Sequence, residues 1–170
     1  MTTLPKLRFR AMEPEDLDVL YAIENDRALW DLGATNVPYS RYVLHDYIAN
    51  AKNDIYADGQ VRMIIENEGG EVVGLIDMMN HDAKNNKAEL GIVVMNRYRR
   101  QGYASAAVSQ MLVYAKSVLH LHQLYAVVAV SNPASSRLFL HSGFSEAARL
   151  RDWLFDGEKY ADALLLQTFL

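Results

Sequence analysis

The apolar positions along this 170-residue chain recur with two different periods, and each period predicts one kind of element. A spacing of three to four residues, as in the run from Ala104 to Ala115, places the apolar side chains on one face of a helix. Short apolar runs rich in β-branched residues predict strands instead. The predicted strands cover 7–10, 61–66, 72–79, 88–95, 123–130, 144–155 and 160–169, and the predicted helices begin near 13, 40, 103 and 133.

Polar residues and glycines mark the boundaries of these elements. Ser40 and Asn132 are predicted N-caps, because their side chains accept hydrogen bonds from the free amides of a first helical turn. Gly143 is expected to end the last helix, while Gly69-Gly70 and Asp156-Gly157 predict tight turns between strands. With no repeat and no convincing linker, the order of elements predicts one α+β domain with a mixed sheet.

Composition narrows the function classes. Hydrophobic residues at 51% and charged residues at 22% are typical of a soluble globular protein, and a net charge of −4 argues against a nucleic-acid partner. The absence of cysteine excludes disulfides, cysteine nucleophiles and thiolate metal sites, and it suits the cytoplasm. His120 and His122 lack further spaced ligands, so no metal is predicted. Polar residues interrupt the uncharged span 117–136, which therefore does not predict a membrane segment.

The stretch 98–107, YRRQGYASAA, lies where a predicted strand ends and the longest predicted helix begins. The N-terminus of a helix carries free amides and a partial positive charge, and it binds anions. Gly102 would let the backbone approach a ligand, and Arg99 and Arg100 add charge that suits a pyrophosphate. A Walker loop is excluded because the stretch lacks a Gly-Lys-Ser/Thr ending, and a dinucleotide loop is excluded because it lacks three glycines. On loop chemistry alone, a polar turn with two solvated arginines remains the alternative.

Two motifs resemble the GNAT superfamily of N-acetyltransferases. Arg99-x-x-Gly102-x-Ala104 is similar to its acetyl-CoA pyrophosphate loop, Gln/Arg-x-x-Gly-x-Gly/Ala. The segment 132–144, with Asn132, Ser135 and then Gly143-Phe144, is similar to its "Asn-x-x-Ser … Gly-Phe" segment.

With the Ala-Glu-Leu-Gly strand at 88–91 and the entry at 7–17, the resemblance covers nearly the whole chain. It implies a single domain over 1–170, with a mixed, mostly antiparallel sheet of about six to seven strands. The implied sheet contains a splayed parallel pair and is flanked by about four helices.

The resemblance also implies that acetyl-CoA, as co-substrate, lies in a cleft between the strands 89–95 and 123–130. One strand and the 100–105 loop would contact it through backbone groups, and Asn132 would hold the pantetheine from the far wall. Asn132 and Ser135 are equally explained as a helix cap and a first-turn residue. The implied cofactor-binding residues are Ile92, Val93, Val94, Arg99, Arg100, Gln101, Gly102, Tyr103, Ala104, Ser105, Asn132, Ser135 and Phe139.

Glu89 is the candidate catalytic base, directly or through water, because it lies at the end of a strand beside the implied cofactor. A solvated glutamate on the face of a strand is the alternative. Phe139 departs from the family, since many members carry a tyrosine there that protonates the departing thiolate, and phenylalanine cannot donate a proton. Substitutes would have to be found among other tyrosines, each also explained as a packed aromatic: Tyr98, Tyr103, Tyr125 and Tyr160.

The acceptor site borders the first two helices in this family. Acidic side chains there face only Arg27, which favours a cationic acceptor, although such acids also suit a helix N-terminus or a solvated face. They are Glu13, Glu15, Asp16, Asp18, Glu24, Asp26 and Asp31.

The tail from Leu150 resembles that of spermidine and diamine acetyltransferases. The predicted function is acetyl transfer to a primary amine, first a polyamine or diamine. The alternatives are a protein N-terminal amine, as in ribosomal-protein-alanine acetyltransferases, and a non-catalytic CoA-binding module. Neither nucleic acid nor membrane is an expected partner, and a homo-oligomer is left open.

Overall fold

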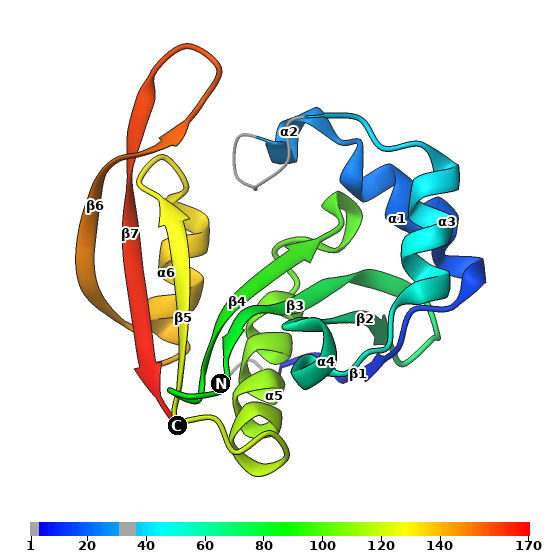
Figure 1. Ribbon diagram of the computed structural model, residues 1–170, viewed down its shortest axis with the longest axis horizontal. Coiled ribbons are helices and arrows are strands. Elements are labelled where there is room, and N and C mark those ends of the chain that lie inside the picture. Colours follow the sequence, from blue (N-terminus) through cyan, green and yellow to red (C-terminus); the bar gives the residue numbers. More distant parts are fainter. Residues whose placement is uncertain (1–3, 31–36) are drawn as a thin grey trace.

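The computed structural model describes residues 4–30 and 37–170, which form one seven-stranded sheet with helices on both faces (Figure 1). The strands are β1 (Leu7–Arg10), β2 (Val61–Asn67), β3 (Val72–Asp82), β4 (Lys87–Val94), β5 (Gln123–Ala129), β6 (Ser145–Phe155) and β7 (Tyr160–Phe169). The helices are α1 (Leu17–Glu24), α2 (Arg27–Trp30), α3 (Arg41–Asn50), α4 (Ile55–Asp58), α5 (Tyr103–Ser117) and α6 (Pro133–His141), with 3-10 turns η1 (Pro14–Asp16) and η2 (Asn96–Tyr98).

The sheet has the order β1-β2-β3-β4-β5-β7-β6, and only its β4–β5 pair is parallel. That pair is short, since Lys87–Glu89 of β4 register with Gln123–Tyr125 of β5 and no pairing follows. Beyond it β4 stays paired to β3 as far as Val94, and β5 stays paired to β7 as far as Ala129. The inner edges therefore separate while the outer edges are held, and the two strands diverge in Figure 1.

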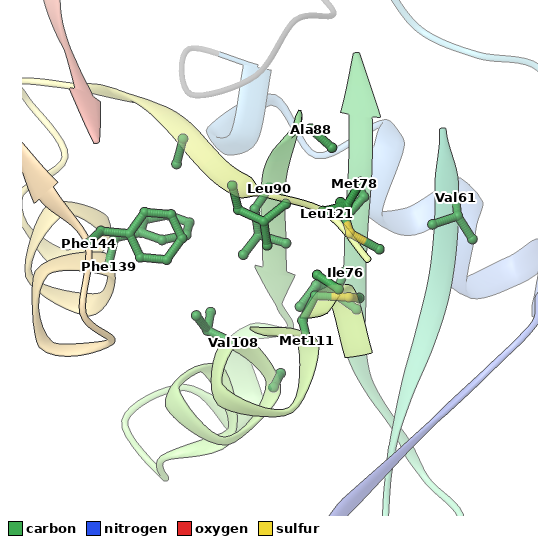
Figure 2. Packing of buried hydrophobic residues seen from close by; sticks show 14 of the residues in the cluster. Val61, Ile76, Met78, Ala88, Leu90, Val108, Met111, Leu121, Phe139 and Phe144 are labelled. Atoms are coloured by element: carbon green, nitrogen blue, oxygen red, sulfur yellow. The ribbon is translucent and has the colours of Figure 1, made fainter. Parts of the chain in front are cut away.

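Helices α5 and α6 cover one face of the sheet. The helical apolar stripe of α5, which includes Ala107, Val108 and Met111, is fully buried against the sheet. Its alanines leave little side chain between helix and strands, so the helix packs closely. Phe139 and Phe144 extend this core beneath β5. Figure 2 shows their side chains on the side of the cluster where Leu90 and Val108 lie.

Helices α1 and α3 cover the opposite face over β2 and β3 through a second cluster of buried side chains. Ile64 and Leu75 are cross-strand partners that point into this cluster, whereas the next residues, Ile65 and Ile76, point toward α5. Because the centres of β2 and β3 are buried on both faces, residues 63–65 and 72–76 read as continuous apolar runs rather than alternating ones.

Ion pairs tie the edge strand β1 to its neighbours. The Arg10 guanidinium donates to both Asp16 oxygens at 2.7 and 2.8 Å and to Glu66 at 2.5 Å, and Arg8 also donates to Glu66 at 2.5 Å. Burial raises the pKa of Asp16, but the bonds from Arg10 and from the Glu13 amide outweigh it and leave that pKa below its ordinary value. Arg10 and Arg8 likewise lower the pKa of Glu66.

The architecture confirms the predicted fold class: a mixed, mostly antiparallel sheet with a splayed parallel pair and four helices of eight residues or more in the described chain. The predicted caps also form, because Ser40 accepts from Val43 N–H and Asn132 from Ser135 N–H. Short helices α2, α4 and η2 were not predicted. The segment 80–87 was expected to be a polar loop, but β3 extends to Asp82 and β4 begins at Lys87.

Within residues 4–30 and 37–170, no helix is long and apolar enough to cross a membrane. The same residues contain no group of three or more histidine, aspartate or glutamate side chains placed to hold a metal ion.

Candidate active site

A cavity of about 590 Å³ lies where β4 and β5 diverge. Its walls come from the separated strand edges, from the loop that leads into α5, and from α6. The cavity is lined by Leu29, Leu90, Gly91, Ile92, Val93, Val94, Tyr98, Arg99, Arg100, Gly102, Tyr103, Ala104, Ser105, Ala126, Val127, Val128, Ala129, Asn132, Ala134, Ser135, Leu138 and Phe139. All the predicted cofactor-binding residues except Gln101 are thus brought to one cavity.

One end of the cavity is the N-terminus of α5. Gly102 is the N-cap with φ +87°, and the hydrogen-bond ladder of the helix begins where Ala106 N–H donates to Gly102 C=O at 3.0 Å. The amides of Tyr103, Ala104 and Ser105 precede that bond, as the first amides of any helix do. They provide donors and a partial positive charge at the cavity wall, which suits an anion.

The arginines of this loop have different surroundings. Arg99 Nε donates to the carbonyl oxygen of Val94 at 2.9 Å, so its side chain folds back over the end of β4. Arg100 is exposed and has a left-handed backbone, φ +60°. Gln101 is directed elsewhere, because its side-chain amide donates to the carbonyl oxygen of Arg97 at 2.8 Å.

The α6 wall combines a cap with an apolar surface. The Asn132 side-chain oxygen accepts from Ser135 N–H at 3.2 Å, and both residues also line the cavity. Capping and lining therefore coexist. Phe139 is 3% exposed, and its ring packs edge-on against that of Phe144, with 5.0 Å between the ring centroids. This position presents a hydrocarbon face and no proton donor to the cavity.

Glu89 lies just outside this lining, one residue before Leu90, at the last paired position before the strands separate. It is half-buried, and its Oε2 accepts from Asn80 Nδ2 at 2.8 Å. Tyr125 is its register partner on β5, and burial followed by the nearby Glu89 and Asp82 charges raises the pKa of Tyr125. A carboxylate and a phenol therefore flank the apex of the splay.

The other tyrosines considered as proton donors lie elsewhere. Tyr98 and Tyr103 line the cavity at its α5 end, where their rings pack edge-on with 5.9 Å between the ring centroids. Tyr160 is exposed in the β6–β7 hairpin beside Phe155. Among the four, Tyr125 is the one that lies at the apex.

The acidic helices are less negative than their sequence indicates. Asp16 pairs with Arg10, Asp18 with Arg41, and Glu24 with Arg62 at 2.5 Å, and all three arginines lie outside the acidic span. Asp26 accepts from Ala28 N–H, Glu13 and Glu15 are exposed, and Asp31 lies outside the described residues. The field that favours a cation is therefore weaker than a count of acids against Arg27 suggests.

Sequence reasoning missed some contributors. Leu29 from the four-residue helix α2 lines this cavity and also a neighbouring one of about 290 Å³, which shares Val93, Val94 and Arg99. A helix of one turn has no periodicity to detect. Leu138 was also missed, although its place beside Phe139 on α6 could have indicated it.

Comparison with known proteins agrees with this geometry. The model of the acetyltransferase (GNAT) domain family matches residues 6–145. Spermidine N(1)-acetyltransferase of Vibrio cholerae is 26% identical over 157 residues, 92% of this chain and 89% of that protein. A putative ribosomal N-acetyltransferase of Bacillus subtilis is 29% identical over 155 residues, 88% of this chain and 83% of that protein.

A crystal structure of the Vibrio cholerae enzyme in complex with CoA and spermine superposes with a TM-score of 0.88 at 24% identity, covering 96% of this chain and 95% of that chain. A dodecameric structure of that enzyme gives a TM-score of 0.81 at 25% identity, covering 96% and 93%. The family model matches most of the chain, and the splayed-strand fold agrees with it. The chain therefore belongs to the GNAT acetyltransferase family and is an N-acetyltransferase.

Proposed function

We propose that this chain, as one domain, transfers an acetyl group from acetyl-CoA to a primary amine, and that the preferred acceptor is a polyamine or diamine. GNAT enzymes use acetyl-CoA, and one cavity here gathers an amide-rich helix end and two separated strand edges, with the Glu89 carboxylate just outside its lining at the apex of the splay. That convergence carries the proposal.

The residues fit acetyl-CoA. The amides of Tyr103, Ala104 and Ser105 and the charge of Arg100 suit a pyrophosphate. Beyond Glu89 and Tyr125, the facing edges of β4 and β5 carry backbone groups that no strand of the described residues pairs, and these can hydrogen-bond the amides of a pantetheine arm. When bound, acetyl-CoA supplies an acetyl group activated as a thioester.

Glu89 is proposed to accept the proton of the attacking amine, directly or through one water. An alkylammonium with a pKa near 10.4 costs roughly 4 to 5 kcal/mol to deprotonate at pH 7. A carboxylate at the apex assists this step because it gives the proton an acceptor beside the amine. The new bond joins the amine nitrogen to the acetyl carbon, the carbon–sulfur bond breaks, and CoA leaves as a thiolate. Phe139 cannot protonate that thiolate, but a thiol with a pKa near 8.5 leaves readily without help.

Relatives named as spermidine N(1)-acetyltransferases support a polyamine acceptor. A specific observation favours the alternative, a protein N-terminal amine. Arg10, Arg41 and Arg62 neutralise acids that would otherwise attract a polycation, and a relative of similar identity is named a putative ribosomal N-acetyltransferase.

A homo-oligomer is also proposed. Trp153, Phe155 and Tyr160 are each more than half exposed in the β6–β7 hairpin, and β6 is the edge strand of the sheet. Exposed apolar side chains beside a free strand edge favour association. A cytoplasmic location stays a prediction from the cysteine-free sequence.

Release of CoA thiol from acetyl-CoA in the presence of spermidine, putrescine or alanine-ended peptides tests the proposal. The highest kcat/KM is expected with spermidine or putrescine, and Glu89→Gln should lose most of it while calorimetric acetyl-CoA affinity is kept. Preference for the peptides would establish the alternative. Binding of acetyl-CoA without acetylation of any amine would refute the proposed transfer to this acceptor class.

A further inference from the structure

A side chain that the proposed reaction does not use reaches the proposed base. Asn80 Nδ2 donates to Glu89 Oε2 at 2.8 Å, across the β3–β4 pair. The register places Met79, not Asn80, opposite Glu89. Since successive side chains of a regular strand point to opposite faces, Asn80 would be expected to point away from Glu89. The local backbone must therefore redirect it.

A β-bulge does this. Between the pairs Met79–Glu89 and Asp82–Lys87, β3 contains two residues where β4 contains one. Asn80 adopts a left-handed backbone, φ +52°, and the next amide, His81 N–H, donates to the carbonyl oxygen of Gly59 at 3.0 Å. Bulges bend a strand and re-aim its side chains, and asparagine tolerates left-handed φ better than most residues.

We propose that Asn80 is a positioning residue that holds the carboxylate of Glu89 at the apex of the splay. The inference rests on the proposed function, in which Glu89 accepts the amine proton. One carboxylate oxygen is bound by the amide, so the other stays free to accept that proton. Without this anchor, a half-buried glutamate would sample several rotamers, and fewer of them would face the acceptor.

The neighbouring groups do not replace the anchor. Lys87, on the same strand, pairs with Asp82 at 3.8 Å. Tyr125 flanks Glu89 on the β5 side, and Met79 opposite it carries no hydrogen-bond donor. In the described part of the chain, Asn80 is the side chain hydrogen-bonded to the Glu89 carboxylate.

A purely structural explanation of Asn80 is that the left-handed backbone prefers asparagine. Two variants separate it from the proposal. Asn80→Gly removes the amide and relaxes the backbone further, since glycine adopts positive φ without strain. Asn80→Asp keeps the shape and much of the left-handed tolerance but puts an anionic acceptor where the donor was.

The proposal predicts that kcat falls about tenfold in Asn80→Gly and further in Asn80→Asp, with acetyl-CoA affinity unchanged. A backbone role instead predicts a different outcome, in which both variants keep the wild-type kcat and Asn80→Gly is the more stable of the two. Wild-type kcat in both variants would overturn the proposal.

A double-mutant cycle tests whether Asn80 acts through Glu89. In the Glu89→Gln background, Asn80→Gly should cause no further loss, whereas an undiminished tenfold loss would refute positioning. A crystal structure of Asn80→Gly gives a readout independent of activity: the Glu89 carboxylate should occupy several rotamers, and a single unchanged one would overturn the anchor. If the wild type acetylates no amine, the proposed function fails, but this structural outcome still decides whether Asn80 orders Glu89.

Discussion

Replacing Gly102 by alanine tests whether the α5 amides form the anion site. Gly102 has φ +87°, and a Cβ there would lie 3.0 Å from Pro5 Cδ. A left-handed backbone costs a residue with a Cβ about 1 to 2 kcal/mol. The contact with Pro5 adds to that cost unless the N-terminal segment shifts. We expect Gly102→Ala to turn the backbone and misdirect the amides of the first turn of α5.

Gly157→Ala is the matched control, because Gly157 has φ +100° in the β6–β7 turn, with no heavy atom within 4 Å of an added Cβ. Both variants should lower the thermal unfolding midpoint by about 2 to 8 °C, from 1 to 2 kcal/mol in a domain of this size. Only Gly102→Ala should also weaken acetyl-CoA binding. A loss of about 1.4 kcal/mol of binding free energy from the misdirected amides corresponds to about tenfold in affinity.

Isothermal calorimetry of both variants with acetyl-CoA decides the question. Equal affinities in wild type and Gly102→Ala, together with the expected loss of stability, would show that the α5 amides do not hold the pyrophosphate. Unchanged stability in both variants would instead refute the strain estimate itself.

Further predictions concern the proton donor that is missing at Phe139, the ion pairs of β1 and the core. Phe139→Tyr should change kcat less than about tenfold in the thiol-release assay, because a thiolate leaves without protonation; a larger gain would show that protonation limits turnover. Arg10 and Arg8 depress the pKa of Glu66, so its contribution to stability is present above about pH 4.5 and is lost as pH falls. Urea unfolding between pH 3 and 7 should therefore depend less on pH in Glu66→Gln, and an identical dependence would contradict the assignment. Met111→Ala should cost about 2 to 5 kcal/mol of unfolding free energy, since Met111 is fully buried under the sheet; a loss below about 1 kcal/mol would show that the core closes around the gap.

Local pattern predicts the elements well but not their pairing directions. The apolar stripe from Ala104 to Ala115 predicts α5, and the caps Ser40 and Asn132 form as expected. The parallel β4–β5 pair came from the family resemblance, because periodicity shows that a segment is a strand but not which way its neighbour runs. The bulge at Asn80 could not be read either, since a polar run such as 80–87 looks the same as a loop.

The acidic helices show a second limit of sequence reasoning. Asp16, Asp18 and Glu24 have arginine partners 6, 23 and 38 residues away in the chain. Counting charges within one segment misses partners that folding brings from other strands and helices. The same limit applies to Glu89, whose hydrogen bond to Asn80 spans nine residues and a bulge.

The two halves of the proposed site depend on different kinds of group, backbone in one and side chains in the other, and this explains why family membership is easier to establish than the acceptor. Backbone groups of β4, β5 and α5 form most of the proposed acetyl-CoA site, and backbone geometry tolerates many changes of side chain. The acceptor would instead meet side chains such as Glu89 and Tyr125, together with the ion-paired acids of α1. Relatives near 25 to 30% identity can share the first half and differ in the second, and two relatives at that identity carry different names, one a spermidine N(1)-acetyltransferase and the other a putative ribosomal N-acetyltransferase. Acceptor choice should therefore respond to substitutions on the α1 side of the sheet, while acetyl-CoA affinity should respond to changes in the backbone at the head of α5.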